Sequence, residues 1–197
     1  MSEPYPNPHT PEERRRLSNL GHWLEGSALG LAGSLALLDA AAPSLKWPGR
    51  WWPRAVAAGG GALGAFIVLG SLHHGGPRRY LRYEPQDREH LQMAALIGAG
   101  GALESLGRST ALRLAPAAAL GAVGQMFLSH EQHGTGEARR ESERVHRRLG
   151  LTVVAGGLAK AGDALGMPGP WRWLWPSLTL ASAGQLLVYR EPAGAYE

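Results

Sequence analysis

The sequence contains no cysteine and only two phenylalanines, and it has few charges over long stretches. Without cysteine, a disulfide framework, a thiolate metal site and a cysteine nucleophile are all excluded. Any transition-metal site must therefore use histidine, carboxylate or methionine ligands. Charged residues make up 18% of the 197 positions, and they gather in a few segments that separate nearly uncharged runs.

The basic balance of the chain, a formal net charge of +4, is typical of proteins that bind nucleic acid or anionic lipid. Its arginines form short clusters beside apolar runs, and aromatic residues do not alternate with them as on a base-stacking surface. We therefore expect no nucleic-acid partner. The clusters from Arg78 to Arg82 and from Arg139 to Arg148 are expected to contact anionic lipids, with docking of a protein partner in a membrane complex as the second expectation.

Six apolar segments follow one another along the chain, and each is close to the ~20 residues that cross a bilayer as a helix. They span about 17–39, 54–74, 89–106, 114–133, 146–166 and 172–189. Residues 55–72 and 114–129 hold no charge and are apolar nearly all round, whereas a helix of a soluble bundle shows a regular polar face. The sequence therefore predicts an all-α integral membrane bundle of six transmembrane helices rather than a soluble helical bundle.

The distribution of arginine and lysine predicts the orientation of this bundle. With six crossings, most of the basic residues fall in the N-terminal tail, the 75–88 and 134–145 loops and the C-terminal tail. This excess places both termini in the cytoplasm, in a plasma membrane of the bacterial inner-membrane type. The predicted divisions are a flexible basic tail over 1–16, a transmembrane domain over 17–190 and a C-terminal tail over 191–197.

The transmembrane domain resembles one helical hairpin repeated three times, over about 17–75, 89–134 and 146–190. The Trp-Pro turn at 48–53 is similar to that at 168–176, and a Gly-Gln step occurs nine residues after a proline at both Gln125 and Gln185. A pseudo-threefold array follows from this repeat. It makes His22, His90 and His146 equivalent and places them around the cytoplasmic end of the centre.

Seven of the eight histidines lie at the ends of the apolar runs, on the predicted cytoplasmic face. Neutral imidazole binds zinc, copper and iron, and paired imidazoles on facing helices can hold a haem by its two axial positions. The expected cofactor-binding residues are His22, His90 and His146, and the expected metal ligands are His73, His74, His130, His133, Glu25 and Glu131. The expected cofactor is accordingly iron, copper, zinc or haem.

Two short motifs resemble histidine boxes of known membrane enzymes. His73-His74 and His130-x-x-His133 resemble the His-x-x-His-His-type boxes of membrane di-iron oxygenases such as desaturases. That resemblance implies several histidine ligands at helix ends that face the cytoplasm.

A third motif, Glu143-x-x-His146-Arg147, is similar to the Glu-x-x-His-Arg motif of haem A synthases. The resemblance covers these five residues and implies haem ligation by the histidine. Haem A synthases have eight helices where six are expected here, so membership of that family is not inferred.

Three acidic residues inside the apolar runs, Asp39, Glu104 and Asp163, are costly in a bilayer unless they are paired or face water. We expect them to line an ion path, with Lys160 spaced to neutralise Asp163. The leading prediction is a multi-pass protein that binds a transition metal or haem at its cytoplasmic face, in redox chemistry or metal handling. Whether it is an enzyme stays open. The alternatives are a proton- or ion-coupled permease and a non-catalytic membrane subunit or assembly scaffold.

Overall fold

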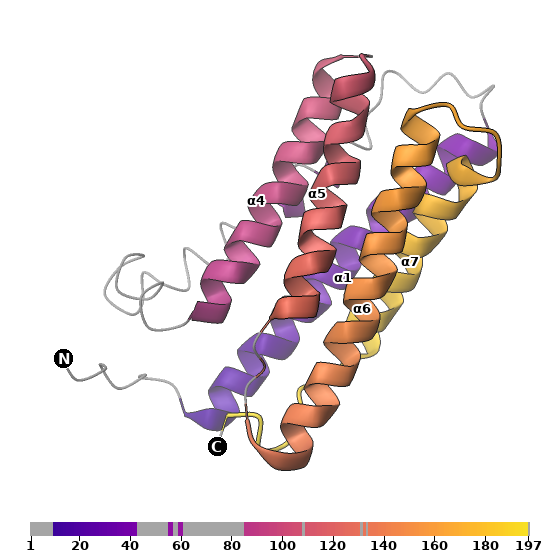
Figure 1. Cartoon of the computed structure of the whole chain (residues 1–197). Coiled ribbons are helices and arrows are strands. Elements are labelled where there is room, and N and C mark those ends of the chain that lie inside the picture. Colours follow the sequence, from indigo (N-terminus) through magenta and orange to yellow (C-terminus); the bar gives the residue numbers. More distant parts are fainter. Residues whose placement is uncertain are drawn as a thin grey trace.

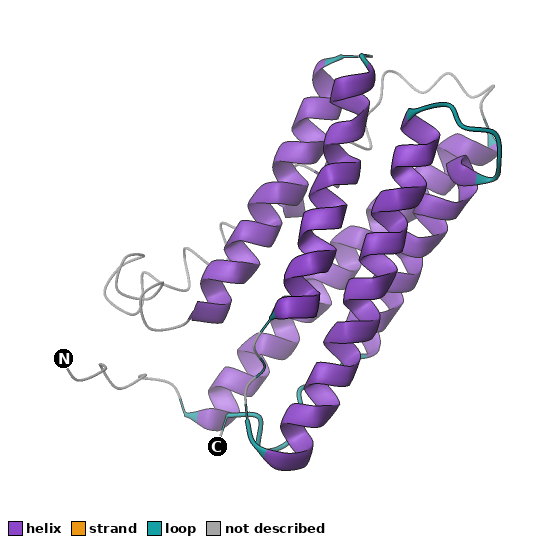
Figure 2. Ribbon diagram, viewed as in Figure 1, coloured by secondary structure: helices purple, strands orange, loops and turns teal. Residues whose placement is uncertain are grey.

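The computed structural model describes residues 10–42, 55–56, 59–60, 85–107, 109–130, 132 and 134–196, and over these residues it is all-helical with no strand (Figure 2). The labelled helices are α1 (Pro11–Ala41), α4 (Pro85–Leu106), α5 (Thr110–Ser129), α6 (Gly136–Ala164) and α7 (Trp171–Val188). The predicted all-α class is confirmed.

The helices form an antiparallel bundle in which α4 packs on α5, α5 on α6, α6 on α7 and α7 on α1 (Figure 1). Short links join α4 to α5 and α6 to α7 at the upper end in this view. The starts of α1, α4 and α6 therefore share the lower end with the ends of α5 and α7. The chain also returns to this end, because Arg14 Nη2 donates to the carbonyl oxygen of Tyr196 at 2.9 Å.

The first helix begins at Thr10-Pro11-Glu12-Glu13, a pattern typical of a helix start, with threonine as the cap, proline in the first turn and acids after it. Glu13 N donates to Thr10 Oγ1 at 3.2 Å and Thr10 N donates to Glu13 Oε2 at 2.9 Å, which forms a capping box, and Pro11 occupies the first helical turn. Residues 11–16, which the sequence analysis placed in the N-terminal tail, thus form the first turns of α1.

Glycine at the helix crossings lets the helices approach closely. A Cβ at Gly124 of α5 would lie 2.6 Å from Val154 Cγ2 and 2.9 Å from the carbonyl oxygen of Gly150, both on α6. At Gly26 of α1, a Cβ would lie 2.9 Å from Leu187 Cγ on α7. Small residues are the ordinary means by which membrane helices pack backbone against backbone.

The number of membrane spans differs from the sequence prediction. Within the described residues, two helices, α1 and α5, are long and apolar enough to cross a membrane. Six spans in three repeated hairpins are not supported, because the described residues form five helices and three of these do not pass that test. Charged turns at the starts of α4 and α6 lower the mean hydropathy of these helices, and Arg172 and Gln185 lower that of α7. The predicted segment 54–74 lies largely outside the described residues.

Candidate metal centre

Four histidines from different parts of the chain meet near the lower end of the bundle. The ring centroids of His22 and His90 are 6.1 Å apart, those of His90 and His130 5.5 Å, those of His130 and His146 5.6 Å, and those of His146 and His22 5.9 Å. These four side chains, here called the His quartet, form a closed ring of imidazoles contributed by α1, α4, the residue after α5, and α6.

The direction of each helix explains why residues far apart in sequence reach one level. Helices α1, α4 and α6 start at the lower end and carry His22, His90 and His146 in their first half, whereas α5 descends and ends just before His130. The structure therefore brings together the three histidines that were predicted to be equivalent, and it adds His130 to them.

Burial and hydrogen bonding leave the quartet suited to binding an ion. His22 is 4% exposed, and neither of its ring nitrogens meets hydrogen-bond geometry with a described residue, although the Ser18 backbone interacts with the ring. His146 Nδ1 donates to the carbonyl oxygen of Ser142 at 2.9 Å, which puts the lone pair of the neutral ring on Nε2. His130 Nδ1 donates to the Glu89 carboxylate, the arrangement that commonly orients a metal-ligating imidazole.

Tyr189 adds a fifth ring to the quartet that sequence reasoning missed. Its ring centroid lies 4.9 Å from that of His22 and 5.7 Å from that of His146, and its hydroxyl group is hydrogen-bonded to Ser142 Oγ at 3.1 Å. Burial, and then the nearby Glu191, raise the pKa of Tyr189 above its ordinary value. The Gly-Gln steps already align the run of α7 with that of α5, and this alignment puts Tyr189 one position before the equivalent of His130.

The C-terminal segment docks beneath the quartet against the start of α1. Ser18 Oγ donates to Glu191 Oε2 at 3.0 Å, and Glu191 N donates to Asn19 Oδ1 at 2.8 Å. Burial raises the pKa of Glu191 above its usual range, although the Ser18 hydrogen bond opposes the shift. Gly134, at φ 80°, permits the close approach of this segment, since a Cβ there would lie 2.9 Å from Ala195 Cα. Residues 191–196 thus form part of the wall of the site.

Among the other expected metal ligands, Glu25 lies one helical turn beyond His22 on α1. Its Oε2 atom is buried and has no hydrogen-bond partner within the described part of the chain. The remaining four, His73, His74, His133 and Glu131, fall outside the described residues.

The three acids of the predicted ion path lie toward the upper end, in different surroundings. Glu104 is buried and accepts a hydrogen bond from Lys160 Nζ at 2.9 Å. Asp39 is exposed and Asp163 is half-buried. The expected partner of Lys160 was Asp163, on local spacing. The structure pairs it with Glu104 instead, because Lys160 is buried inside the bundle, where α4 supplies the acid.

The imidazoles of the quartet lie slightly farther apart than the ligands of one bound metal ion would. No three of the described histidine, aspartate and glutamate side chains are already placed to hold one metal ion. Imidazole nitrogens about 2.0–2.1 Å from a tetrahedral ion put the ring centres roughly 5 Å apart. The observed separations of 5.5–6.1 Å exceed this value by about an ångström or less, a distance within the reach of side-chain rotation.

Comparison with known proteins does not identify a family or a function for this chain. The sequence matches no protein-family model, and neither a curated protein nor a solved structure matches it. Function is therefore argued from the residues and geometry of the site.

The Glu89–His130 pair gives a direct test of these surroundings. Burial and then His90 lower the pKa of His130 below its ordinary value, while the hydrogen bond to Glu89 opposes the shift. Replacing Glu89 with glutamine (Glu89→Gln) is expected to lower this pKa further, because the anion that favours the imidazolium is removed. The measurement is an NMR titration of labelled histidines in the metal-free protein, with Glu141→Gln, an exposed position on α6, as the control.

The lowered pKa of His130 also determines how the stability of the protein depends on pH. A neutral, buried His130 contributes stability that is present above the ordinary histidine pKa of about 6.5 and is lost as the pH falls through the lower folded-state value. A pKa that rises in Glu89→Gln, or moves equally in Glu141→Gln, contradicts the proposed role of Glu89.

Proposed function

We propose that this is a membrane protein that binds a transition-metal ion through the His quartet, at the cytoplasmic end of its bundle, and acts in redox chemistry or metal handling. The observation that carries the proposal is the closed ring of four imidazoles, in which His22 and His146 are buried and neither His22 nitrogen meets hydrogen-bond geometry with a described residue. A buried polar atom without a partner is costly, and a metal ion would take the lone pair of one His22 nitrogen. Imidazole sets suit zinc, copper, iron and nickel.

A bare ion fits the quartet better than a haem. The ring centroid of each imidazole lies within 6.1 Å of two others, and the Tyr189 ring packs against both His22 and His146. A porphyrin held between two of these imidazoles would occupy the space of their neighbours, because the axial ligands stand on opposite faces of the haem plane. The expected cofactor is therefore copper, zinc or iron bound directly by histidine.

Exposed apolar side chains support a position in a membrane. In the most apolar windows of α1 and α5, 28% and 33% of residues are buried, and apolar side chains such as Leu31 of α1 and Leu128 of α5 are exposed. Large apolar residues are also exposed on the other helices, among them Leu103 and Leu106 on α4, Leu151 and Leu158 on α6, and Trp173 and Val188 on α7. An outward-facing apolar surface on every helix is what a lipid environment requires.

The basic residues support a cytoplasmic position for the quartet. Arginines at the lower end of the bundle include Arg14, Arg15, Arg16, Arg88, Arg139, Arg140, Arg144, Arg147, Arg148 and Arg190. Arg113 and Arg172 lie at the upper end, beside the start of α5 and the tryptophans that open α7. Excess arginine marks the cytoplasmic side and tryptophan marks an interface. The basic end is also where anionic lipids would bind.

The proposal also includes six membrane crossings, arranged as three repeated helical hairpins. Its support is that His22, His90 and His146, one from each proposed repeat, lie at one level of the bundle. Pro116 and Pro176 likewise occupy similar positions inside α5 and α7.

A proton- or ion-coupled permease is the second candidate. It is favoured by the buried Glu104–Lys160 pair, because ionisable groups inside a membrane protein commonly mark ion pathways. A non-catalytic subunit or assembly scaffold, with interfacial histidines, is the third reading.

Metal analysis and an absorption spectrum of the purified protein separate these functions. We expect about one copper, zinc or iron ion per chain and no Soret band, in line with a single four-ligand site. A Soret band would assign the imidazoles to haem. Protein without metal that conducts protons or cations in liposomes would support the permease, and protein with neither property would support the scaffold.

A further inference from the structure

One helical turn above the quartet, five described residues form a layer that is apolar except for one carboxyl group. Glu25, Met93, Phe127, Leu149 and Leu186 each stand three residues from a quartet histidine or from Tyr189. The last four belong to the buried core cluster. Glu25 is thus the polar member of an otherwise hydrophobic layer that lies directly on the histidines.

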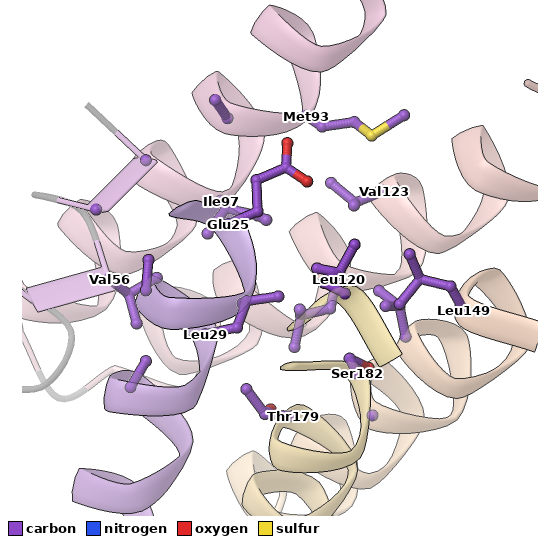
Figure 3. A pocket seen from close by; sticks show the side chains of 18 of the residues that line it. Glu25, Leu29, Val56, Met93, Ile97, Leu120, Val123, Leu149, Thr179 and Ser182 are labelled. Atoms are coloured by element: carbon purple, nitrogen blue, oxygen red, sulfur yellow. The ribbon is translucent and has the colours of Figure 1, made fainter. Parts of the chain in front are cut away.

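This layer borders a cavity of about 190 Å³ between the helices (Figure 3). All five labelled helices contribute to its lining. Three hydroxyl side chains also line it, and each donates to a backbone carbonyl of its own helix: Thr152 to Arg148, Thr179 to Trp175 and Ser182 to Leu178. Glu25 differs from them, because its buried Oε2 atom has no hydrogen-bond partner among the described residues and its carboxyl group points toward Met93 and Val123.

The size of the cavity restricts what it can hold. An engineered apolar cavity of about 150 Å³ binds benzene, so a space of about 190 Å³ suits one six-membered ring with small substituents. Phe127 and Met93 in the lining add favourable contacts for an aromatic ring. One unsatisfied acceptor in an apolar chamber calls for a ligand with a hydrogen-bond donor at its edge.

Building on the proposed metal site, we propose that this cavity binds a hydroxylated aromatic ring of the phenol class, with its hydroxyl group donating to Glu25. The ring then lies in the apolar chamber and its polar edge faces the quartet, one helical turn from the imidazoles. In this proposal Glu25 binds the phenol and does not coordinate the metal ion.

The test compares phenol with toluene, which has nearly the same shape but no donor, and with 1-hexanol, which has the donor but no ring. Binding to the full-length protein in detergent is measured by calorimetry, with and without prior treatment with a chelator. We expect phenol to bind tightest. The Glu25→Gln variant should weaken phenol binding by about tenfold or more and leave toluene binding and metal content unchanged. The Ala32→Leu variant, which fills the cavity, should weaken binding of both rings.

The outcomes of this test distinguish phenol binding at Glu25 from metal binding at the quartet. Equal binding of phenol and toluene, preference for 1-hexanol, or unchanged phenol affinity in Glu25→Gln overturns the inference while a metal-loaded quartet still stands. Loss of metal in Glu25→Gln also overturns it, because the carboxylate would then be a metal ligand. Phenol binding to a protein that never takes up metal supports the cavity assignment and overturns the metal proposal.

Discussion

Single replacement of any quartet histidine by alanine is expected to lower the affinity for Zn²⁺ by about a hundredfold or more. The four variants are His22→Ala, His90→Ala, His130→Ala and His146→Ala. Each removes one of four direct ligands, and loss of an outer-shell partner alone typically costs about 10–100-fold. Zinc affinity is measured by competition with a chromophoric chelator, and the metal content of the purified variants is measured alongside it.

The matched control is Gln92→Ala, an exposed position two residues from His90 on α4. It should keep the parental affinity, and circular dichroism should show the same helix content in all five variants. A quartet variant that binds zinc as tightly as the parent removes that histidine from the site. Parental affinity in all four variants would refute the metal-binding function.

Helix positions and the meeting of the histidines were accessible from sequence because they depend on local pattern and chain direction. Apolar runs with few or no charges predicted α4, α5 and α7 to within several residues of their observed bounds, whereas α6 begins ten residues before its predicted segment. The Thr10 cap is likewise a local feature, because its partner Glu13 lies three residues away in the chain. Alternating directions then bring His22, His90 and His146 to one end.

Other features depend on how each helix is rotated and on what packs against it, which a single sequence does not encode locally. Local spacing suggested Asp163 as the partner of Lys160, but the rotation of α6 turns Lys160 toward Glu104 of α4. Tyr189 ends an apolar run, and nothing in its local sequence identifies it as a site residue. Its role follows only from the packing of α7, which places its ring beside His22. The cavity beside Glu25 is lined by residues of all five labelled helices and by Val56, Gly59 and Gly60, so no single run or motif in the sequence predicts it.

Breaking the buried ion pair at the upper end is the second change with a large expected effect. The side chains of Lys160 and Glu104 are 4% and 2% exposed, with Nζ and Oε1 2.9 Å apart, and the Lys160 ammonium lies 4.4 Å from the centre of a Trp175 ring. Lys160→Met leaves the acid without its counter-ion, and Glu104→Gln does the same to the ammonium. Removal of one partner of such a pair costs about 3–5 kcal/mol, so each variant should unfold at markedly lower temperature or denaturant concentration.

The double variant Lys160→Met/Glu104→Leu discriminates the pair from simple packing. With both charges gone, no ion is left uncompensated, and stability should return to about the parental value or exceed it, since apolar replacements of buried pairs are often neutral or stabilising. Glu143→Gln is the matched control, because the Arg139–Glu143 pair joins Nε and Oε1 at 2.8 Å but its side chains are 46% and 47% exposed. Its loss should cost less than about 1 kcal/mol. Additive losses in the double variant would mean that the two residues stabilise the bundle through independent packing, and that the charge pair itself contributes little.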